Sequence, residues 1–150
     1  MKFGELTPKN FEQLRVINYM TLPVIYSERF YDYLTSMRRY SKLAYIKDVL
    51  VGAISCKEDI DDSGEHVCYI MTITVLKPYR RYGIGTQLLE KAQEECMRQR
   101  NVKRMRLHMQ FGNDQALAFY KKAGFEIAET LEDYYTDLTP SGCYVLEKLI

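Results

Sequence analysis

Two glycines where a strand gives way to a helix are the clearest candidates for ligand chemistry in this chain. Residues 67–75 are rich in β-branched and aromatic side chains, which predicts a strand that Pro78 ends. Gly83 and Gly85 follow, and apolar residues then recur at three- and four-residue spacing, as in an amphipathic helix. A glycine turn lets backbone approach a ligand, and the unpaired N–H groups of a helix N-terminus attract anions. The stretch predicts a phosphate site, with a ligand-free turn as the open alternative.

The spacing of these glycines distinguishes this loop from two known phosphate-binding loops. A Rossmann fingerprint needs a third glycine where Leu88 stands, and the P-loop pattern is absent. What remains is Arg80-x-x-Gly83-x-Gly85 between a strand and a helix. This motif resembles the acyl-CoA pyrophosphate loop of the GCN5-related N-acetyltransferases (GNAT). The resemblance implies that acetyl-CoA is the cosubstrate.

Tyr69 and His108 are the side chains best suited to move a proton. His108 lies in an alternating strand predicted over residues 103–109. If that strand pairs with residues 67–75, the two side chains flank a common groove. Taken singly, a packed sheet tyrosine and a solvent-facing histidine explain them as well. A period of two predicts four residues on one face of the first strand: Tyr69, Met71, Ile73 and Val75.

An α-amine is an acceptor that this pair could serve. Its unperturbed pKa is about 7.7–8.0, so it must lose a proton before it attacks a carbonyl carbon. Histidine, with a pKa of about 6.5, suits the task, whereas tyrosine at about 10 would act through a bound water. Cys68 lies two residues after His66 but inside an apolar strand pattern, the other three cysteines have no histidine nearby in sequence, and none stands at a predicted helix N-terminus, so direct transfer is expected rather than an acyl-enzyme.

The whole chain predicts one α/β domain spanning residues 1–150. The element order β-α-α-β-β-β-α-β-α-β-β resembles the GNAT fold, which implies a mixed, mostly antiparallel central sheet with about four helices. Residues 58–65 are expected to form an acidic, solvated turn, and the basic residues within 98–104 a solvated helix end.

Composition narrows the class of protein. With 21 basic and 20 acidic residues the net charge is +1, which argues against a nucleic-acid-binding face. No apolar run approaches the roughly 20 residues of a membrane span, and the first residues lack an apolar signal core. We therefore expect a cytoplasmic protein, with the nucleus left open as a second location. Two histidines and four scattered cysteines predict no metal site and reduced core cysteines.

Several local runs are more specific than the fold and resemble the NatE-type N-terminal acetyltransferases over nearly the full length. They are Leu22-Pro23-Val24-x-Tyr26, Tyr69-Ile70-Met71-Thr72, residues 78–85, Leu107-His108, Asn113, Phe119-Tyr120, Gly124-Phe125-Glu126 and Tyr134-Tyr135. The resemblance implies transfer of acetyl to the α-amine of peptides that begin with methionine followed by a hydrophobic residue. It also implies an ordered water held by Tyr69 and His108 as general base, and backbone N–H groups near Ile73 that stabilise the oxyanion.

The same resemblance implies the binding residues. Leu22 stands where the family usually has phenylalanine, which implies a roomier pocket for the first residue of the peptide. Tyr120 could protonate the departing thiolate, or it could only pack. The implied cofactor-binding residues are Ile73, Val75, Arg80, Arg81, Gly83, Ile84, Gly85, Thr86, Asn113 and Tyr120. The implied substrate-binding residues are Leu22, Pro23, Val24, Tyr26, Met71, Tyr134, Tyr135 and Leu138.

The implied partners are the N-terminal segments of nascent or mature proteins, together with the catalytic and auxiliary subunits of NatA at the ribosome. No direct contact with nucleic acid or membrane is expected. Two alternatives stay open: an acetyltransferase for lysine or a small amine, and a non-catalytic CoA-binding subunit of a ribosome-associated complex. Tyr69 with His108 argues against the second, and the runs 22–24 and 134–135 argue against the first.

Overall fold

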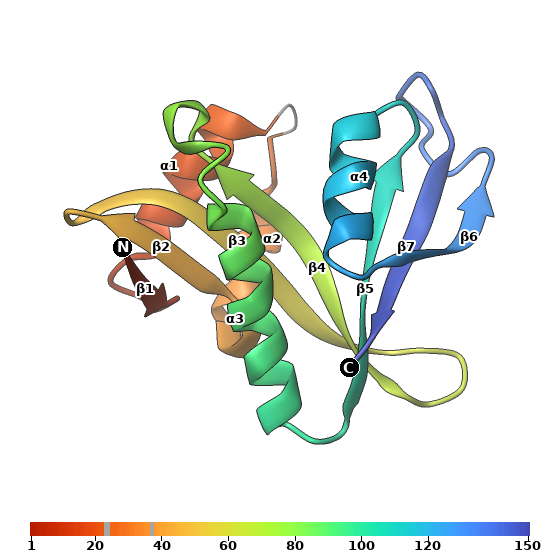
Figure 1. The fold of residues 1–150 in the computed structure, drawn as a ribbon, viewed down its shortest axis with the longest axis horizontal. Helices are drawn as coiled ribbons and strands as arrows, with labels where there is room; N and C mark the ends of the chain where they lie inside the picture. Colours follow the sequence, from red (N-terminus) through yellow and green to blue (C-terminus); the bar gives the residue numbers. More distant parts are fainter. Residues whose placement is uncertain (23–24, 37) are drawn as a thin grey trace.

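A mixed seven-stranded sheet forms the centre of the molecule (Figure 1). The computed structural model describes residues 1–22, 25–36 and 38–150. The strands are β1 (Lys2–Glu5), β2 (Lys42–Ile46), β3 (Val49–Ile60), β4 (His66–Val75), β5 (Val102–Gln110), β6 (Glu126–Leu131) and β7 (Cys143–Leu149). They lie in the order β1-β2-β3-β4-β5-β7-β6; β4 and β5 pair in parallel, and the other described neighbours pair antiparallel. The predicted mixed, mostly antiparallel sheet is confirmed.

Four α-helices in the described ranges cover the two faces of this sheet (Figure 1). They are α1 (Phe11–Thr21), α2 (Glu28–Ser36), α3 (Ile84–Arg98) and α4 (Asp114–Lys122). On one face Leu14 of α1 and Leu34 of α2 join a buried apolar cluster. On the other, Leu88 of α3 and Tyr120 of α4 join a larger cluster. Each helix buries an apolar stripe against the sheet, so the chain forms three layers, helices on sheet on helices.

A β-bulge at Met71 interrupts the alternation of β4. Cys56 of β3 is paired with Ile70, and its neighbour Ser55 is paired with Thr72, so Met71 has no partner opposite it. Met71 packs against the α1/α2 cluster, whereas Ile73 packs against the α3/α4 cluster. The prediction that Tyr69, Met71, Ile73 and Val75 share one face is therefore wrong beyond Met71, because a period of two assumes that no residue is inserted.

The parallel pair of β4 and β5 is short and opens at one end. Register partners run from His66 with Val102 to Tyr69 with Arg106, and the described pairing ends there. The remaining halves of the two strands diverge, with β4 leaning toward α1 and β5 toward β7 (Figure 1). Pairing beside Tyr69 brings the strand of His108 next to it, which is the condition on which a groove shared by the two side chains depended. Beyond Tyr69 the two strands are no longer paired, which leaves an opening between them.

Most of the two charged stretches predicted to be solvated is exposed, with residues 61–65 in a turn and Arg98 at the end of α3, but Glu58 and Arg104 lie within strands. β3 continues to Ile60, so Glu58 belongs to a strand; its Oε1 accepts a 2.5 Å hydrogen bond from the hydroxyl of Tyr40, and its Oε2 lies 2.8 Å from Nδ1 of His66. Arg104 lies in β5, not at a helix end, and forms an ion pair with Asp61. Tertiary partners thus override the local preference of charged residues for turns.

The four cysteines, Cys56, Cys68, Cys96 and Cys143, are buried and free of disulfides. Burial raises the pKa of the Cys143 thiol, which keeps that thiol protonated. Among the described residues no helix is long and apolar enough to cross a bilayer.

Candidate active site

A cleft of about 540 Å³ lies where β4 and β5 diverge. Its walls come from the end of β4, the loop that follows it, the first turn of α3 and one side of α4. All ten residues that the sequence predicted to bind the cofactor line this cleft: Ile73, Val75, Arg80, Arg81, Gly83, Ile84, Gly85, Thr86, Asn113 and Tyr120. Residues far apart in the chain thus form one concave surface.

The loop before α3 has the backbone shape of an anion site. Arg81 and Gly83 have φ angles of 72° and 77°, and the Arg80 Nε donates a 2.9 Å hydrogen bond to the carbonyl of Val75. Gly83 is the N-cap of α3, and no side chain caps that helix. The first N–H groups of α3 therefore face the cleft without a capping partner, and left-handed residues in the loop turn further N–H groups the same way. This arrangement fits a pyrophosphate.

The wall formed by α4 is apolar and was partly missed at the sequence level. A Cβ on Gly85 would lie 3.2 Å from the Phe119 ring, so the two elements touch at a glycine. Phe119 meets Tyr120 edge to face, and burial raises the pKa of Tyr120. Asn113 caps α4, as predicted, through its Oδ1, which accepts a 3.1 Å hydrogen bond from the N–H of Ala116. The lining residues without a prediction are Thr21, Thr74, Tyr79, Gln115, Ala116 and Phe119.

Of these six, three carried a usable sequence signal. Gln115, Ala116 and Phe119 occur two, three and six residues after Asn113, a spacing that places them on one side of the helix that Asn113 begins. Of the other three, Thr74 and Tyr79 are neighbours in the chain of predicted residues, whereas Thr21 of α1 reaches the cleft only through the tertiary fold.

Tyr69 and His108 form a hydrogen-bonded pair outside this cleft. The Tyr69 hydroxyl lies 2.7 Å from Nδ1 of His108. The Tyr134 ring stacks on the imidazole at a centroid distance of 4.6 Å, and Tyr135 meets Tyr134 edge to face at 5.0 Å. The pair lines a separate cavity of about 80 Å³, with Asp59, Ile60, Asp61, Val67 and Arg106 as its other walls.

The surroundings keep both members of this pair uncharged. Burial, then the neighbouring Tyr134 and Tyr135, raises the pKa of Tyr69. Burial, then the positive charge of Arg106, lowers the pKa of His108, against an opposing effect of Glu129. A protonated Tyr69 can donate to Nδ1, and we therefore assign the proton of the neutral imidazole to Nε2. His108 is thus available to accept a proton near neutral pH.

The predicted peptide-binding residues are divided between two places. Leu22 lines the cofactor cleft. Met71 and Tyr26 pack against the α1/α2 cluster, and Tyr26 stacks on Phe30 at 4.3 Å. Burial and then Cys143, Tyr134 and Tyr26 raise the pKa of Tyr135, which places Tyr26 near it. Leu138 is 36% exposed, and Pro23 and Val24 lie outside the described residues.

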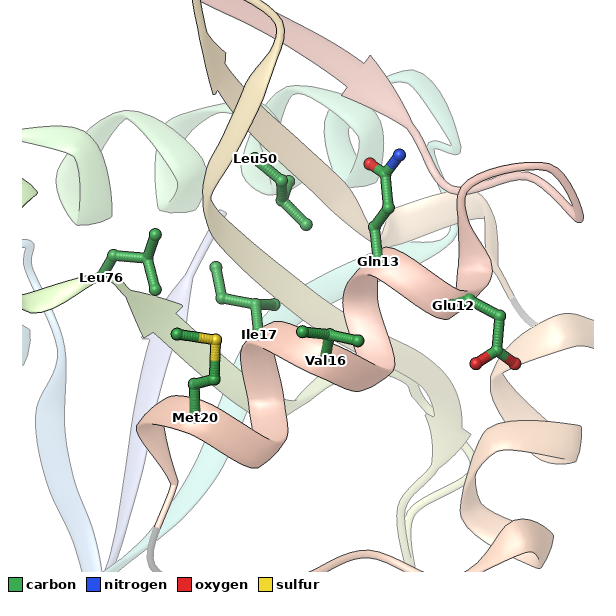
Figure 2. Close-up of a pocket in the computed structure, with 7 residues that line it drawn as sticks. All are labelled: Glu12, Gln13, Val16, Ile17, Met20, Leu50 and Leu76. Atoms are coloured by element: carbon green, nitrogen blue, oxygen red, sulfur yellow. The ribbon is translucent and has the colours of Figure 1, made fainter.

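A second hollow, of about 320 Å³, contains none of the predicted residues. It lies between α1 and the neighbouring ends of β3 and β4, and Ile17, Met20 and Leu76 point toward one another there (Figure 2). Glu12 points away from these apolar side chains (Figure 2). Its apolar lining offers no chemistry for a reaction. Within the described ranges, no group of three or more His, Cys, Asp or Glu side chains could hold a metal ion.

Comparison with known proteins gives three kinds of relative. Residues 9–125 match the Acetyltransferase (GNAT) family. N-alpha-acetyltransferase 50 of Danio rerio is 38% identical over 148 residues, 99% of this chain and 88% of that protein. The probable N-acetyltransferase san of Drosophila melanogaster is 39% identical over 150 residues, 100% of this chain and 81% of that protein. The structure of Arabidopsis thaliana Naa50 with the bisubstrate analogue CoA-Ac-MVNAL superimposes with a TM-score of 0.87 at 39% identity, covering 98% of this chain and 97% of that one.

Proposed function

This chain belongs to the acetyltransferase (GNAT) family and is an acetyl-CoA-dependent N-alpha-acetyltransferase, and on that premise we propose its substrate class and mechanism. We propose that it acetylates the α-amine of peptides that begin with methionine followed by a hydrophobic residue. The observation that carries the proposal is the 2.7 Å contact between Tyr69 and His108, which lies beside the end of β4–β5 pairing. A proton-accepting pair there can reach an amine directed at the cofactor cleft.

The bulge at Met71 explains how two substrates can meet across a sheet. Ile73 and Val75 face the cofactor cleft beside α3, whereas Tyr69 lies on the α1/α2 side with its register partner Lys57. The peptide would approach on the side of Tyr69, and acetyl-CoA would lie on the other. The divergence of β4 and β5 connects the two sides.

The cleft residues bind and orient the cosubstrate. Acetyl-CoA supplies the activated acetyl group. The N–H groups of the loop and of the first turn of α3 hold its pyrophosphate, and the Phe119 and Tyr120 rings provide an apolar wall along which the chain of the cosubstrate can lie. Burial raises the pKa of Tyr120 and keeps its hydroxyl protonated, so it is a weak acid that would donate a hydrogen bond to the departing thiolate.

The Tyr69–His108 pair removes the proton from the amine. A water at the Tyr69 hydroxyl accepts that proton and passes one to the tyrosine oxygen, while the hydroxyl proton moves to Nδ1 of His108. Tyrosine then relays a proton without becoming an anion, which its raised pKa requires. Tyr134 holds the imidazole ring in place by stacking.

Several apolar and tyrosine side chains support the proposed preference for a first methionine. Leu22, Met71 and Tyr26 offer apolar surface, and Tyr134 and Tyr135 present hydroxyl groups that can bind the peptide backbone. The Arabidopsis relative was solved with an analogue whose peptide part reads MVNAL, a methionine followed by valine. Leu22→Phe should narrow the pocket, so comparison of second-residue preference between this variant and the wild type tests the contribution of Leu22.

The partners implied by the family resemblance and the location expected from the sequence are proposals as well. We propose that the chain acts on N-terminal segments of nascent or mature proteins, that it associates with the catalytic and auxiliary subunits of NatA at the ribosome, and that it resides in the cytoplasm, with the nucleus as a second location. Co-sedimentation with ribosomes before and after depletion of the auxiliary subunit tests the association. Absence of the chain from the ribosomal fraction in both cases would contradict it.

Acetyl transfer to two peptides, detected by intact mass, tests the proposed reaction. One peptide begins with free Met-Leu and contains no lysine; the other has a blocked N-terminus and internal lysines. We expect the first to gain one acetyl group and the second to remain unmodified. Modification mainly of the second would favour a lysine acetyltransferase. If neither reacts although acetyl-CoA binds, the chain is a CoA-binding subunit or uses another acceptor.

A further inference from the structure

An ion pair on the strand of His108 has no part in the mechanism described so far. Arg106 of β5 is the register partner of Glu147 of β7. Its Nε lies 2.6 Å and its Nη2 2.5 Å from the same carboxylate oxygen, Oε2 of Glu147, and both side chains are partly buried. The Nε of Arg104 lies 3.5 Å from this oxygen as well. The Arg106 guanidinium is therefore held in one direction by the neighbouring strand.

Arg106 lies beside the Tyr69–His108 pair, because it is the register partner of Tyr69. Arg106 and His108 are two residues apart on one strand, so their side chains lie on the same face, with Cα atoms about 7 Å apart. Arg106 lines the same 80 Å³ cavity as His108 and Tyr69, so the charge and the imidazole share one small space. A positive charge at that distance opposes protonation of the ring.

We propose that Arg106, positioned by Glu147, adds its charge to the effect of burial and so helps to keep the His108 imidazole uncharged at the pH of the reaction. Arg106 is a positioning residue in this scheme, because it acts on the substrate only through His108. Its part in catalysis rests on the proposed function, whereas its control of the charge on His108 does not.

Other groups around His108 set the direction of each expected effect. Glu129 favours the charged ring, and Glu147 partly neutralises Arg106. Removal of the Arg106 charge should therefore make His108 easier to protonate, and removal of the Glu147 charge should make it harder. The titratable and charged groups near the imidazole are Tyr69 of β4, Asp59 and Asp61 at the end of β3, Arg104 and Arg106 of β5, Glu129 of β6, Glu147 of β7, and Tyr134 and Tyr135 between β6 and β7.

A direct titration of His108 tests the proposal without any assay of activity. The chain has two histidines, so His66→Gln assigns the two imidazole signals in an NMR spectrum of histidine-labelled protein. Arg106→Met should raise the titration midpoint of His108 by about half a pH unit or more, and Arg106→Lys should keep it near the wild-type value. Glu147→Gln should lower it. Lys103→Met removes a positive charge from an exposed position of β5, three residues before Arg106, and should leave the midpoint unchanged.

Kinetics then test the consequence for the reaction. The acid limb of the kcat/KM profile should move with the NMR midpoint, upward for Arg106→Met and downward for Glu147→Gln. An unchanged midpoint in Arg106→Met would overturn the proposal. Shifts in the same direction for both variants would also overturn it, because loss of packing alone does not predict opposite shifts of the His108 midpoint. If the wild type fails to acetylate the Met-Leu peptide, the proposed function fails, but the NMR midpoints still decide whether Arg106 controls His108. If Arg106→Met does not fold, the His108 midpoints of Glu147→Gln and Arg106→Lys still test the proposal.

Discussion

At the scale of single residues, this site depends on two side chains that stay neutral. A phenol buried beside other tyrosines does not ionise, and an imidazole buried near an arginine resists protonation. The hydrogen bond between Tyr69 and His108 then has one natural direction, from the hydroxyl to Nδ1. Neither a tyrosine alone nor a histidine alone would provide a relay of this kind.

We expect His108→Ala and Tyr69→Phe each to lower turnover by about 10²-fold or more, because each removes one member of the proton relay. Affinity for acetyl-CoA should remain near the wild-type value, since neither side chain lines the cofactor cleft. Steady-state kinetics with the Met-Leu peptide, together with calorimetry of acetyl-CoA binding, measure the two effects. Tyr19→Phe and His66→Ala are matched controls away from the pair, and near-wild-type turnover in both active-site variants would refute the assignment.

At the scale of elements, the cofactor cleft exists because one loop and two helices meet. The loop before α3 has left-handed residues at positions 81 and 83, and only the glycine adopts that conformation without steric cost. The next glycine, Gly85, serves a different purpose, because it lets the first turn of α3 lie against Phe119 of α4. The two glycines therefore make separate contributions, one to the turn and one to helix packing.

Gly85→Val should weaken acetyl-CoA binding by about tenfold or more. Its side chain would collide with the Phe119 ring, 3.2 Å from the Cβ position, and would crowd the N–H groups at the start of α3. Calorimetry measures the affinity. Partial recovery in the double variant Gly85→Val/Phe119→Leu would assign the loss to this contact, whereas an unchanged affinity in Gly85→Val would show that the first turn of α3 does not hold the cosubstrate.

At the scale of the whole molecule, a buried lysine connects β1 and β2 to α3. Lys42 of β2 is 4% exposed, and its Nζ lies 2.9 Å from both carboxylate oxygens of Glu5 and 3.2 Å from Oε1 of Glu95. Glu95 also accepts a hydrogen bond from Arg98. This network lies at the far end of α3 from the cleft, so it belongs to the stability of the fold rather than to catalysis.

Glu95→Gln should lower the free energy of unfolding by about 1–3 kcal/mol at pH 7, because Lys42 loses one of its two carboxylates. Hydrogen bonds from Arg98, then Gln99 and Lys42, lower the pKa of Glu95 from 4.5 to about 2 in the fold. A depressed pKa stabilises the protein above about pH 4.5, and this contribution is lost as the pH falls toward 2. Urea unfolding should therefore show a difference between wild type and variant that shrinks over that range.

Glu94→Gln is the matched control for this effect. Glu94 is the preceding carboxylate on the same helix, its side chain is 54% exposed, and it lies 3.8 Å from Lys91. The substitution Glu94→Gln should change the free energy of unfolding by less than about 0.5 kcal/mol. Equal losses in the two variants would show that the contact with Lys42 contributes nothing specific.

Much of this protein follows from local signals in its sequence. Period-two and period-3.6 patterns predicted the order of strands and helices, and the glycines near residue 84 predicted the turn that the structure contains. These features depend on neighbours a few residues away, so sequence spacing is sufficient. The family resemblance implied the ten cofactor-binding residues, and the structure brings all ten to one surface.

Tertiary structure alone decided how these parts face one another. The bulge at Met71 depends on the register between β3 and β4, and no local pattern within β4 signals it. It separates Tyr69 from Ile73 and so places the Tyr69–His108 pair and the 540 Å³ cleft on different sides of the sheet. The pair of Arg106 and Glu147 spans 41 positions of the chain and forms only because β5 and β7 align. Charge effects on His108 act through space, and the distances that govern them arise only when the strands are assembled.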